Sequence, residues 1–193
     1  MKSKIDKCIK NAVDNYMLVQ EDKELQLNIQ KIVELSIVAF KNDKKMLLCG
    51  NGGSASDAQH IAAELSGRFY FDRPPLYAEA LHVNSSYITA VANDYGYDET
   101  YARMLEAAGK EGDILIGIST SGNSANVVNA LVRAKEIGVT TIGFTGKEGG
   151  KMKDICDIMI QIPSDDTPRI QEAHILVGHI ICQLIEENMF GNE

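Results

Sequence analysis

Two loops rich in glycine and hydroxyl residues each lie between an apolar run and a helical pattern. The first is "GNGGSAS", residues 50–56, after "MLLC", and the second is "STSGNSAN", residues 119–126, after "ILIGI". Glycine lets the backbone approach a ligand closely, hydroxyls donate hydrogen bonds, and a following helix offers free N–H groups at its positive dipole end. Such loops can hold a phosphate group without a charged side chain.

Helix capping is the simpler explanation for these hydroxyls. In the first loop, Ser56 with Gln59 fits the spacing of a capping box, and Ser54 with Asp57 fits its acidic form. In the second loop capping accounts for one serine, whereas four hydroxyl residues lie close together: Ser119, Thr120, Ser121 and Ser124. We therefore predict that the second loop binds a phosphate or a similar anion.

A dinucleotide site is an alternative for the first loop, because Gly50, Gly52 and Ala55 match the pattern G-x-G-x-x-[GA] between a strand and a helix. That site would require an acidic residue at the end of the next strand, where this chain has "HVN", residues 82–84. The pattern G-x-x-x-x-G-K-[ST] does not occur in the sequence either. Nucleotide binding is therefore the weaker interpretation.

His60 and Glu64 follow the first loop and stand four residues apart, so both project from one face of the predicted helix. A solvated ion pair is the ordinary explanation for such spacing. The residues around Glu64, such as Ile61 and Leu65, are apolar, so we expect its carboxylate to be partly desolvated. An imidazole and a desolvated carboxylate are suited to general acid–base catalysis.

The last helix, "PRIQEAHILVGHIICQLIEE", is apolar around most of its circumference but carries four polar candidates: Gln171, Glu172, His174 and His179. At about 100° per residue the two histidines point roughly 140° apart, so we expect one of them to be structural. Rotation aligns Glu172 best with His179, whereas Gln171 lies about 80° away and can still converge on a ligand. Spacing leaves the choice between Gln171 and Glu172 open.

The surrounding pattern predicts an α/β fold. Two helices, about 3–20 and 23–41, come first, and short apolar runs then alternate with helical segments up to a long helix that begins at Pro168, with Thr167 as its N-cap. This alternation is typical of a three-layer, doubly wound parallel sheet with helices on both faces. We expect one domain over residues 1–193, with 1–42 a helical extension that packs against another subunit.

Composition excludes several classes of protein. The formal net charge of −8 and the isoelectric point of about 5.0 argue against a nucleic-acid surface. No stretch of the sequence is apolar over the roughly 20 residues that a membrane span needs, and the N-terminus lacks the apolar core of a signal peptide. The four cysteines lie far apart and contain no C-x-x-C pair, which favours a reducing cytoplasm.

Five segments together resemble the phosphoheptose isomerases of the sugar isomerase (SIS) superfamily: "CGNGGSASDAQHIAAEL", "AVANDYG", "GISTSGNSANV", "TGKEGGKM" and "RIQEAHILVGHI". The resemblance covers essentially all of residues 45–190. It implies an SIS-type fold and the conversion of sedoheptulose 7-phosphate to D-glycero-D-manno-heptose 7-phosphate through an enediol, toward heptose for bacterial lipopolysaccharide or capsule. It also implies a homotetramer with active sites at subunit interfaces.

The resemblance assigns roles to individual residues. Glu64 corresponds to the family's base and His179 to its acid, and His174 is left as the structural histidine. The substrate-binding positions implied are Asn51, Gly52, Gly53, Glu64, Asn93, Asp94, Ser119, Thr120, Ser121, Ser124 and Gln171. In members that bind zinc, the matching ligands are His60, Glu64, Gln171 and His179, so the family's choice is Gln171 and not Glu172.

Two alternatives remain open at this point. A regulatory SIS protein would keep the fold and the sugar-phosphate cradle but lose the acid and the base, and the presence of both Glu64 and His179 favours the enzyme. An isomerase for another sugar phosphate would use similar loops, because these loops recognise phosphate better than they recognise chain length.

The role of the metal is also open. A Glu64 bound to zinc is a poorer base, so the metal is catalytic, stabilising or inhibitory, and the sequence does not decide which.

Overall fold

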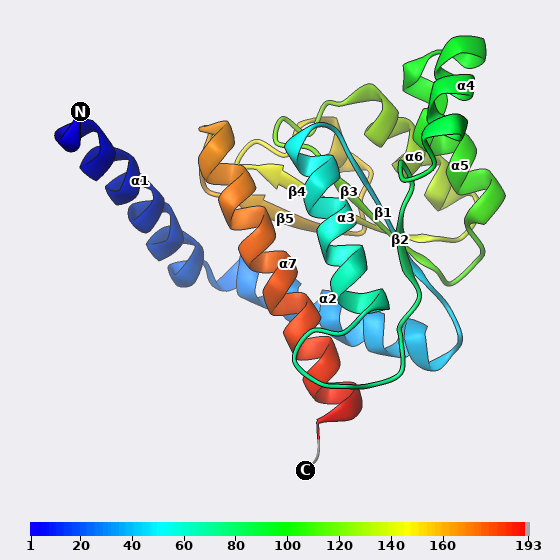
Figure 1. Ribbon diagram of the computed structural model, residues 1–193, viewed down its shortest axis with the longest axis horizontal. Helices are drawn as coiled ribbons and strands as arrows, with labels where there is room; N and C mark the ends of the chain where they lie inside the picture. The colour runs from blue at the N-terminus through cyan, green and yellow to red at the C-terminus, as the bar shows by residue number, and fades with distance from the viewer. Residues whose placement is uncertain (192–193) are drawn as a thin grey trace.

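The computed structural model describes residues 1–191 and is built around a five-stranded parallel sheet (Figure 1). The strands are β1 (Met46–Gly50), β2 (Ala78–Ala80), β3 (Ile114–Ile118), β4 (Thr140–Gly146) and β5 (Ile158–Ile162), in the spatial order β2-β1-β3-β4-β5. All residues of β1 and β3 are buried, as expected for parallel strands covered on both faces. The predicted α/β fold is confirmed.

Helices cover the sheet in two layers. One layer contains α2 (Lys23–Lys41), α3 (Gly53–Ser66) and α7 (Thr167–Phe190), which share a hydrophobic core with one face of the strands. The other contains α5 (Thr100–Ala108), α6 (Ala125–Glu136) and the 3-10 helix η2 (Gly150–Asp154), which form a second core. Helix α4 (Ser85–Tyr95) and the 3-10 helix η1 (Tyr97–Glu99) precede α5 along the chain.

The two N-terminal helices differ in how they pack. Helix α2 buries seven residues and belongs to the first core, so it is a part of the layered domain of its own chain. Helix α1 (Lys2–Glu21) buries only Asn15 and Val19, and its N-terminal half projects away from the rest of the chain (Figure 1). The expected packing against another subunit therefore applies chiefly to α1, where it stays a prediction.

The predicted helix caps are wrong in detail. Helix α3 begins at Gly53 with Gly52 as its N-cap, so Ser54 and Ser56 lie inside the helix instead of capping it. Gly52 has a φ of 57°, a conformation that glycine adopts without strain, and this turn starts the helix without a serine cap. At α7 the N-cap is Asp166 and not Thr167, because the helix takes in one residue before Pro168.

None of the helices in residues 1–191 is both long enough and apolar enough to cross a membrane.

Candidate active site

The two glycine- and hydroxyl-rich loops follow β1 and β3, the neighbouring strands at which the strand order reverses. From β1 the chain passes to β2 on one side of it, and then to β3 on the other. In open parallel sheets, ligands bind beyond the carboxyl ends of the strands at such a reversal, where loops lead into helix N-termini. The topology therefore places both loops at the position where a ligand is expected.

The second loop forms a compact group of hydroxyls. The Oγ atom of Ser119 lies 2.9 Å from that of Ser124 and 3.5 Å from that of Ser121. Ser124 is the N-cap residue of α6, but its side chain makes no capping hydrogen bond and turns to Ser119 instead. Capping therefore does not explain these serines, and they face one another at a helix N-terminus, where an anion is favoured.

The loop keeps this shape because it is tied to the segment after β4. Gly122 has a φ of 67°, and an added Cβ would lie 2.1 Å from the carbonyl oxygen of Gly149, so this position requires glycine. The amide of Gly146 donates to the carbonyl of Thr120 at 2.9 Å, and the amide of Lys151 donates to the Asn123 side chain at 3.1 Å. These contacts from residues 146–151 hold the loop that carries the serine cluster.

A pair of asparagines joins the first loop to the second. The side-chain amide of Asn51 donates to Asn126 Oδ1 at 2.8 Å, and the amide of Asn126 donates back to Asn51 Oδ1 at 2.9 Å. The hydroxyl of Tyr97 also donates to Asn51 Oδ1, at 3.0 Å, and Tyr101 donates to the carbonyl of Gly50. The sequence did not predict that Asn126, Tyr97 and Tyr101 bind the first loop, although Asn126 is the last residue of the second loop.

His60, Glu64 and His179 form one cluster between α3 and α7. His60 Nε2 lies 3.0 Å from Glu64 Oε1, and the rings of His60 and His179 are 4.9 Å apart between centroids. The two helices approach closely because α7 has Gly178 at the crossing, where an added Cβ would lie 2.5 Å from the Ile61 side chain. The fold thus brings the His60–Glu64 pair of α3 against the His179 imidazole of α7.

These three side chains lie close enough together to hold a metal ion. One ligand atom from each of His60, Glu64 and His179 lies within 4.8 Å of the others. His179 Nε2 is buried without a hydrogen-bond partner among the described residues, which is costly unless a ligand completes it. Burial first, and then the nearby His60, lower the pKa of His179, while Glu64 opposes this. These effects favour the neutral imidazole, the form that binds a metal ion.

Gln171 and Glu172 separate clearly in the structure. An added Cβ at Gly53 would lie 2.5 Å from Gln171 Nε2, so the glutamine side chain lies against the first turn of α3, at the first loop. Glu172 instead accepts a hydrogen bond from Arg169 at 2.6 Å. Helical rotation alone did not decide between Gln171 and Glu172. In the structure, Gln171 lies at the first loop, whereas Glu172 turns to Arg169.

Comparison with known proteins gives the same picture. Residues 11–146 match the SIS domain family model. Over 193 residues the chain is 53% identical to phosphoheptose isomerase from Clostridium acetobutylicum, covering 100% of this chain and 98% of that protein. The chain belongs to the phosphoheptose isomerase family.

Solved structures of the phosphoheptose isomerase family have the same fold. The phosphoheptose isomerase GmhA from Neisseria gonorrhoeae superposes with a TM-score of 0.90 at 39% identity, covering 96% of this chain and 98% of that one. The enzyme from Francisella tularensis gives a TM-score of 0.92 at 34% identity, over 96% and 97% of the two chains. The chain is therefore an isomerase with an SIS-type fold.

His174, the histidine expected from the sequence to be structural, lies in the core. His174 is fully buried, and its Nε2 donates to the carbonyl of Thr145 at 3.1 Å. Burial lowers its pKa to about 4, so the ring is neutral and takes no part in the cluster around His179. The structure thus agrees with the separation of roughly 140° about the helix axis that five residues at about 100° each give after one full turn.

Asn93 and Asp94, which the family resemblance placed at the sugar, lie on the exposed last turn of α4. The side-chain amide of Asn93 donates to Asp94 Oδ1 at 2.8 Å. Figure 1 draws α4 on the far side of the sheet from α7. Their assignment to substrate stays a prediction.

Proposed function

We propose that the chain interconverts sedoheptulose 7-phosphate and D-glycero-D-manno-heptose 7-phosphate, supplying heptose for bacterial lipopolysaccharide or capsule. The observation that carries this is the cluster of His60, Glu64 and His179, formed by α7 and by the helix α3 that leaves the first loop. The names of the relatives, phosphoheptose isomerases from Clostridium acetobutylicum and Neisseria gonorrhoeae, support the substrate class.

The reaction moves a carbonyl between C1 and C2 of the sugar. Starting from the ketose, Glu64 takes a proton from C1 while the C2 carbonyl oxygen gains one from an acid, which gives an enediol. Return of a proton to C2 and loss of the O1 proton then give the aldose, so no atoms are gained or lost. His179 is the acid in this scheme, because its ring faces the same space as Glu64 and even the neutral imidazole carries one N–H proton to donate.

The second loop anchors the phosphate in this proposal. Ser119, Ser121 and Ser124 offer hydroxyl donors at the N-terminus of α6, where the helix dipole favours an anion. Thr120 belongs to the same loop. The sugar chain then extends from this anchor toward the first loop, Asn51 to Gly53, and toward Gln171 beside it.

Zinc is the proposed metal. The unpartnered buried nitrogen of His179 and the donor set of two imidazoles and a carboxylate fit Zn²⁺, with Gln171 as a weak fourth ligand. Bound there, the metal would polarise the sugar carbonyl. A Glu64 that binds the metal is less free to accept a proton, so one question for experiment is whether zinc raises or lowers the rate.

Isotope exchange tests the proposed reaction. The purified chain is incubated with sedoheptulose 7-phosphate in deuterated water, with and without Zn²⁺, and the C1 and C2 positions are followed by NMR. We expect deuterium at both positions together with the heptose product. If the chain binds the sugar phosphate but exchanges no deuterium, neither with nor without Zn²⁺, the result would contradict the proposed reaction and favour a regulatory sugar-phosphate-binding protein. Exchange in a shorter sugar phosphate but not in this one would point to a different substrate.

Removal of two hydroxyls from the second loop should weaken phosphate binding selectively. For Ser119→Ala with Ser121→Ala we expect the affinity for the sugar phosphate to fall about 10- to 100-fold, since each lost hydrogen bond to a charged group is worth about 1.5–3 kcal/mol and the remaining donors compensate in part. Calorimetry on the phosphorylated and the free sugar measures this. An equal loss for both sugars would place the phosphate elsewhere.

We further propose that the chain assembles as a homotetramer with active sites at the interfaces. Helix α1 supports this, because Ile5, Ile9, Val13 and Met17 repeat every four residues and are each about half exposed. A stripe of this kind on a projecting helix is typical of an interface. Sedimentation should give a tetramer for the wild type and smaller species for Ile9→Glu; a monomeric wild type would contradict the assembly.

A further inference from the structure

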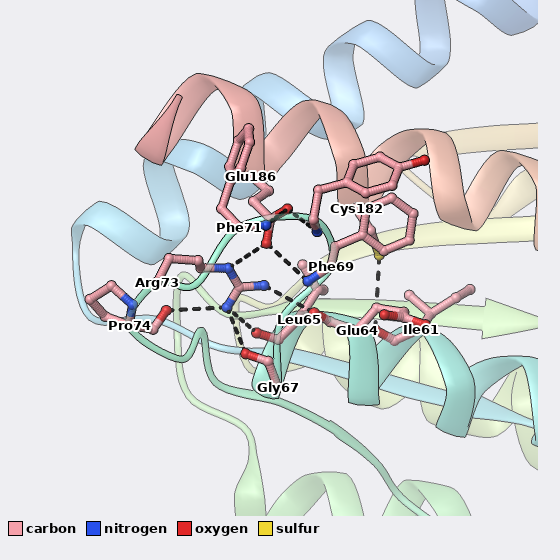
Figure 2. A network of polar contacts seen from close by, with 11 residues as sticks. Ile61, Glu64, Leu65, Gly67, Phe69, Phe71, Arg73, Pro74, Cys182 and Glu186 are labelled. Carbon is pink, nitrogen blue, oxygen red and sulfur yellow. Dashed lines mark hydrogen bonds and ion pairs between the residues drawn. The ribbon is translucent and has the colours of Figure 1, made fainter. Parts of the chain in front are cut away.

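A buried ion pair joins α7 to the segment that follows α3 (Figure 2). Arg73 Nε donates to Glu186 Oε1 at 2.9 Å, and the two side chains are only 2% and 1% exposed. The same carboxylate accepts the backbone N–H groups of three consecutive residues, Phe69, Tyr70 and Phe71. Four donors thus share two oxygens, and these bonds hold the pKa of Glu186 below its usual range despite burial.

The other side of the Arg73 guanidinium binds the end of α3. Its NH2 group donates to the carbonyl of Glu64 at 2.9 Å, and its NH1 group donates to the carbonyls of Leu65 at 2.7 Å and Gly67 at 3.2 Å. Carbonyls at a helix C-terminus lack intrahelical partners, and a cation there also complements the helix dipole. Arg73 therefore fixes the turn of α3 that carries Glu64.

Glu186 connects that turn to the part of α7 that carries His179. The two residues are seven positions apart, or about two helical turns, so they share a face of α7. Phe69, whose N–H binds Glu186, places its ring 5.8 Å from the His179 ring between centroids. The ion pair thus binds the main chain of Glu64 directly and, through Phe69, is linked to the ring of His179.

We propose that Arg73 and Glu186 are positioning residues that set the separation of Glu64 and His179, an inference that rests on the proposed function. A buried ion pair is a weak source of stability, because desolvation offsets its attraction. Its geometric effect is larger, because an error of about 1 Å between reacting groups can cost about 100-fold in rate. Substitution of residues that orient metal ligands likewise lowers the affinity for the metal by about 10- to 100-fold.

The test is Arg73→Lys, which keeps the charge opposite Glu186 but removes the fork that binds the carbonyls of α3. We expect kcat to fall about tenfold with KM within about twofold, because the phosphate loop lies on other elements. Zinc affinity, measured by competition with a chromophoric chelator, should fall about tenfold as well. Glu186→Gln, which removes the charge instead, should change both quantities in the same direction.

The matched control is a second buried ion pair, which joins the residues just before β1 and β3. Lys45 Nζ lies 2.6 Å from Asp113 Oδ2, and the side chains are 12% and 1% exposed. Lys45→Arg should leave kcat and zinc affinity within about twofold of the wild type, whatever it does to the melting temperature, because the side-chain bonds of this pair reach neither α3 nor α7. If Lys45→Arg and Arg73→Lys change kcat and zinc affinity equally, both measured on the folded fraction of each variant, the proposal would be overturned.

Two further outcomes bear on the proposal: variants that fail to fold, and a wild type that is inactive. If both Arg73→Lys and Glu186→Gln fail to fold, Phe69→Leu provides a test that leaves both members of the ion pair in place. It should lower kcat about threefold without changing KM, because the ring positions His179 in this proposal. An unchanged kcat would overturn the proposal. A wild type that binds zinc but does not isomerise would reject the proposed function alone, since zinc affinity still measures the positioning. A wild type that does neither would reject both.

Discussion

Replacing Glu64 with glutamine is expected to lower turnover by about 10²- to 10⁴-fold while sugar-phosphate binding stays nearly unchanged. The amide keeps the size and shape of the side chain but cannot accept a proton from C1. Binding should survive because the phosphate is held by the serines of the second loop, on a different strand and helix. The measurement is kcat from the rate of product formation, together with calorimetric binding of the sugar phosphate.

Glu172→Gln is the matched control for this variant. It makes the same chemical change on α7, at a carboxylate that binds Arg169 and lies outside the cluster of His60, Glu64 and His179. We expect its turnover to stay within about threefold of the wild type. Wild-type turnover in Glu64→Gln, or an equal loss in Glu172→Gln, would reject Glu64 as the base.

The fold could be predicted from the sequence because its signals are local. Apolar runs such as "MLLCG" and "ILIGI" alternate with helical patterns, and this order alone indicates a parallel sheet covered on both faces. Strand reversal at β1 and β3 then brings the two loops together. The pairing of His60 with Glu64 was also local, since four residues separate them on one helix.

The parts that the sequence did not predict depend on contacts between distant segments. Arg73 binds Glu186 across 113 positions, and Asn51 binds Asn126 across 75, and no periodicity relates either pair. The choice of Gln171 over Glu172 is of the same kind, because it depends on where α7 crosses the N-terminus of α3. The caps failed for a different reason: a glycine turn begins α3 where capping statistics favour serine.

The second large effect is on stability in acid and comes from His174. Burial lowers the pKa of its ring to about 4 in the folded chain, from an ordinary value of 6.5. Between these two values the unfolded chain binds a proton that the folded chain does not. The contribution of His174 to stability is therefore fully present above about pH 6.5 and falls by about 1.4 kcal/mol per unit as the pH drops toward 4.

His174→Gln isolates this contribution, because its amide can still donate to the carbonyl of Thr145 but does not titrate. From about pH 7.5 to 5, the wild type should lose about 2 kcal/mol more of its free energy of unfolding than the variant does, as measured by urea denaturation at each pH. Other titrating groups, including Asp57, whose pKa burial raises to about 6, are present in both chains and cancel in the difference. Turnover at pH 7.5 should stay within about threefold, because His174 is in the core and the cluster is on another face of α7. Parallel stability curves for the two chains, or a large loss of turnover in the variant, would mean that His174 is not a buried neutral histidine outside the site.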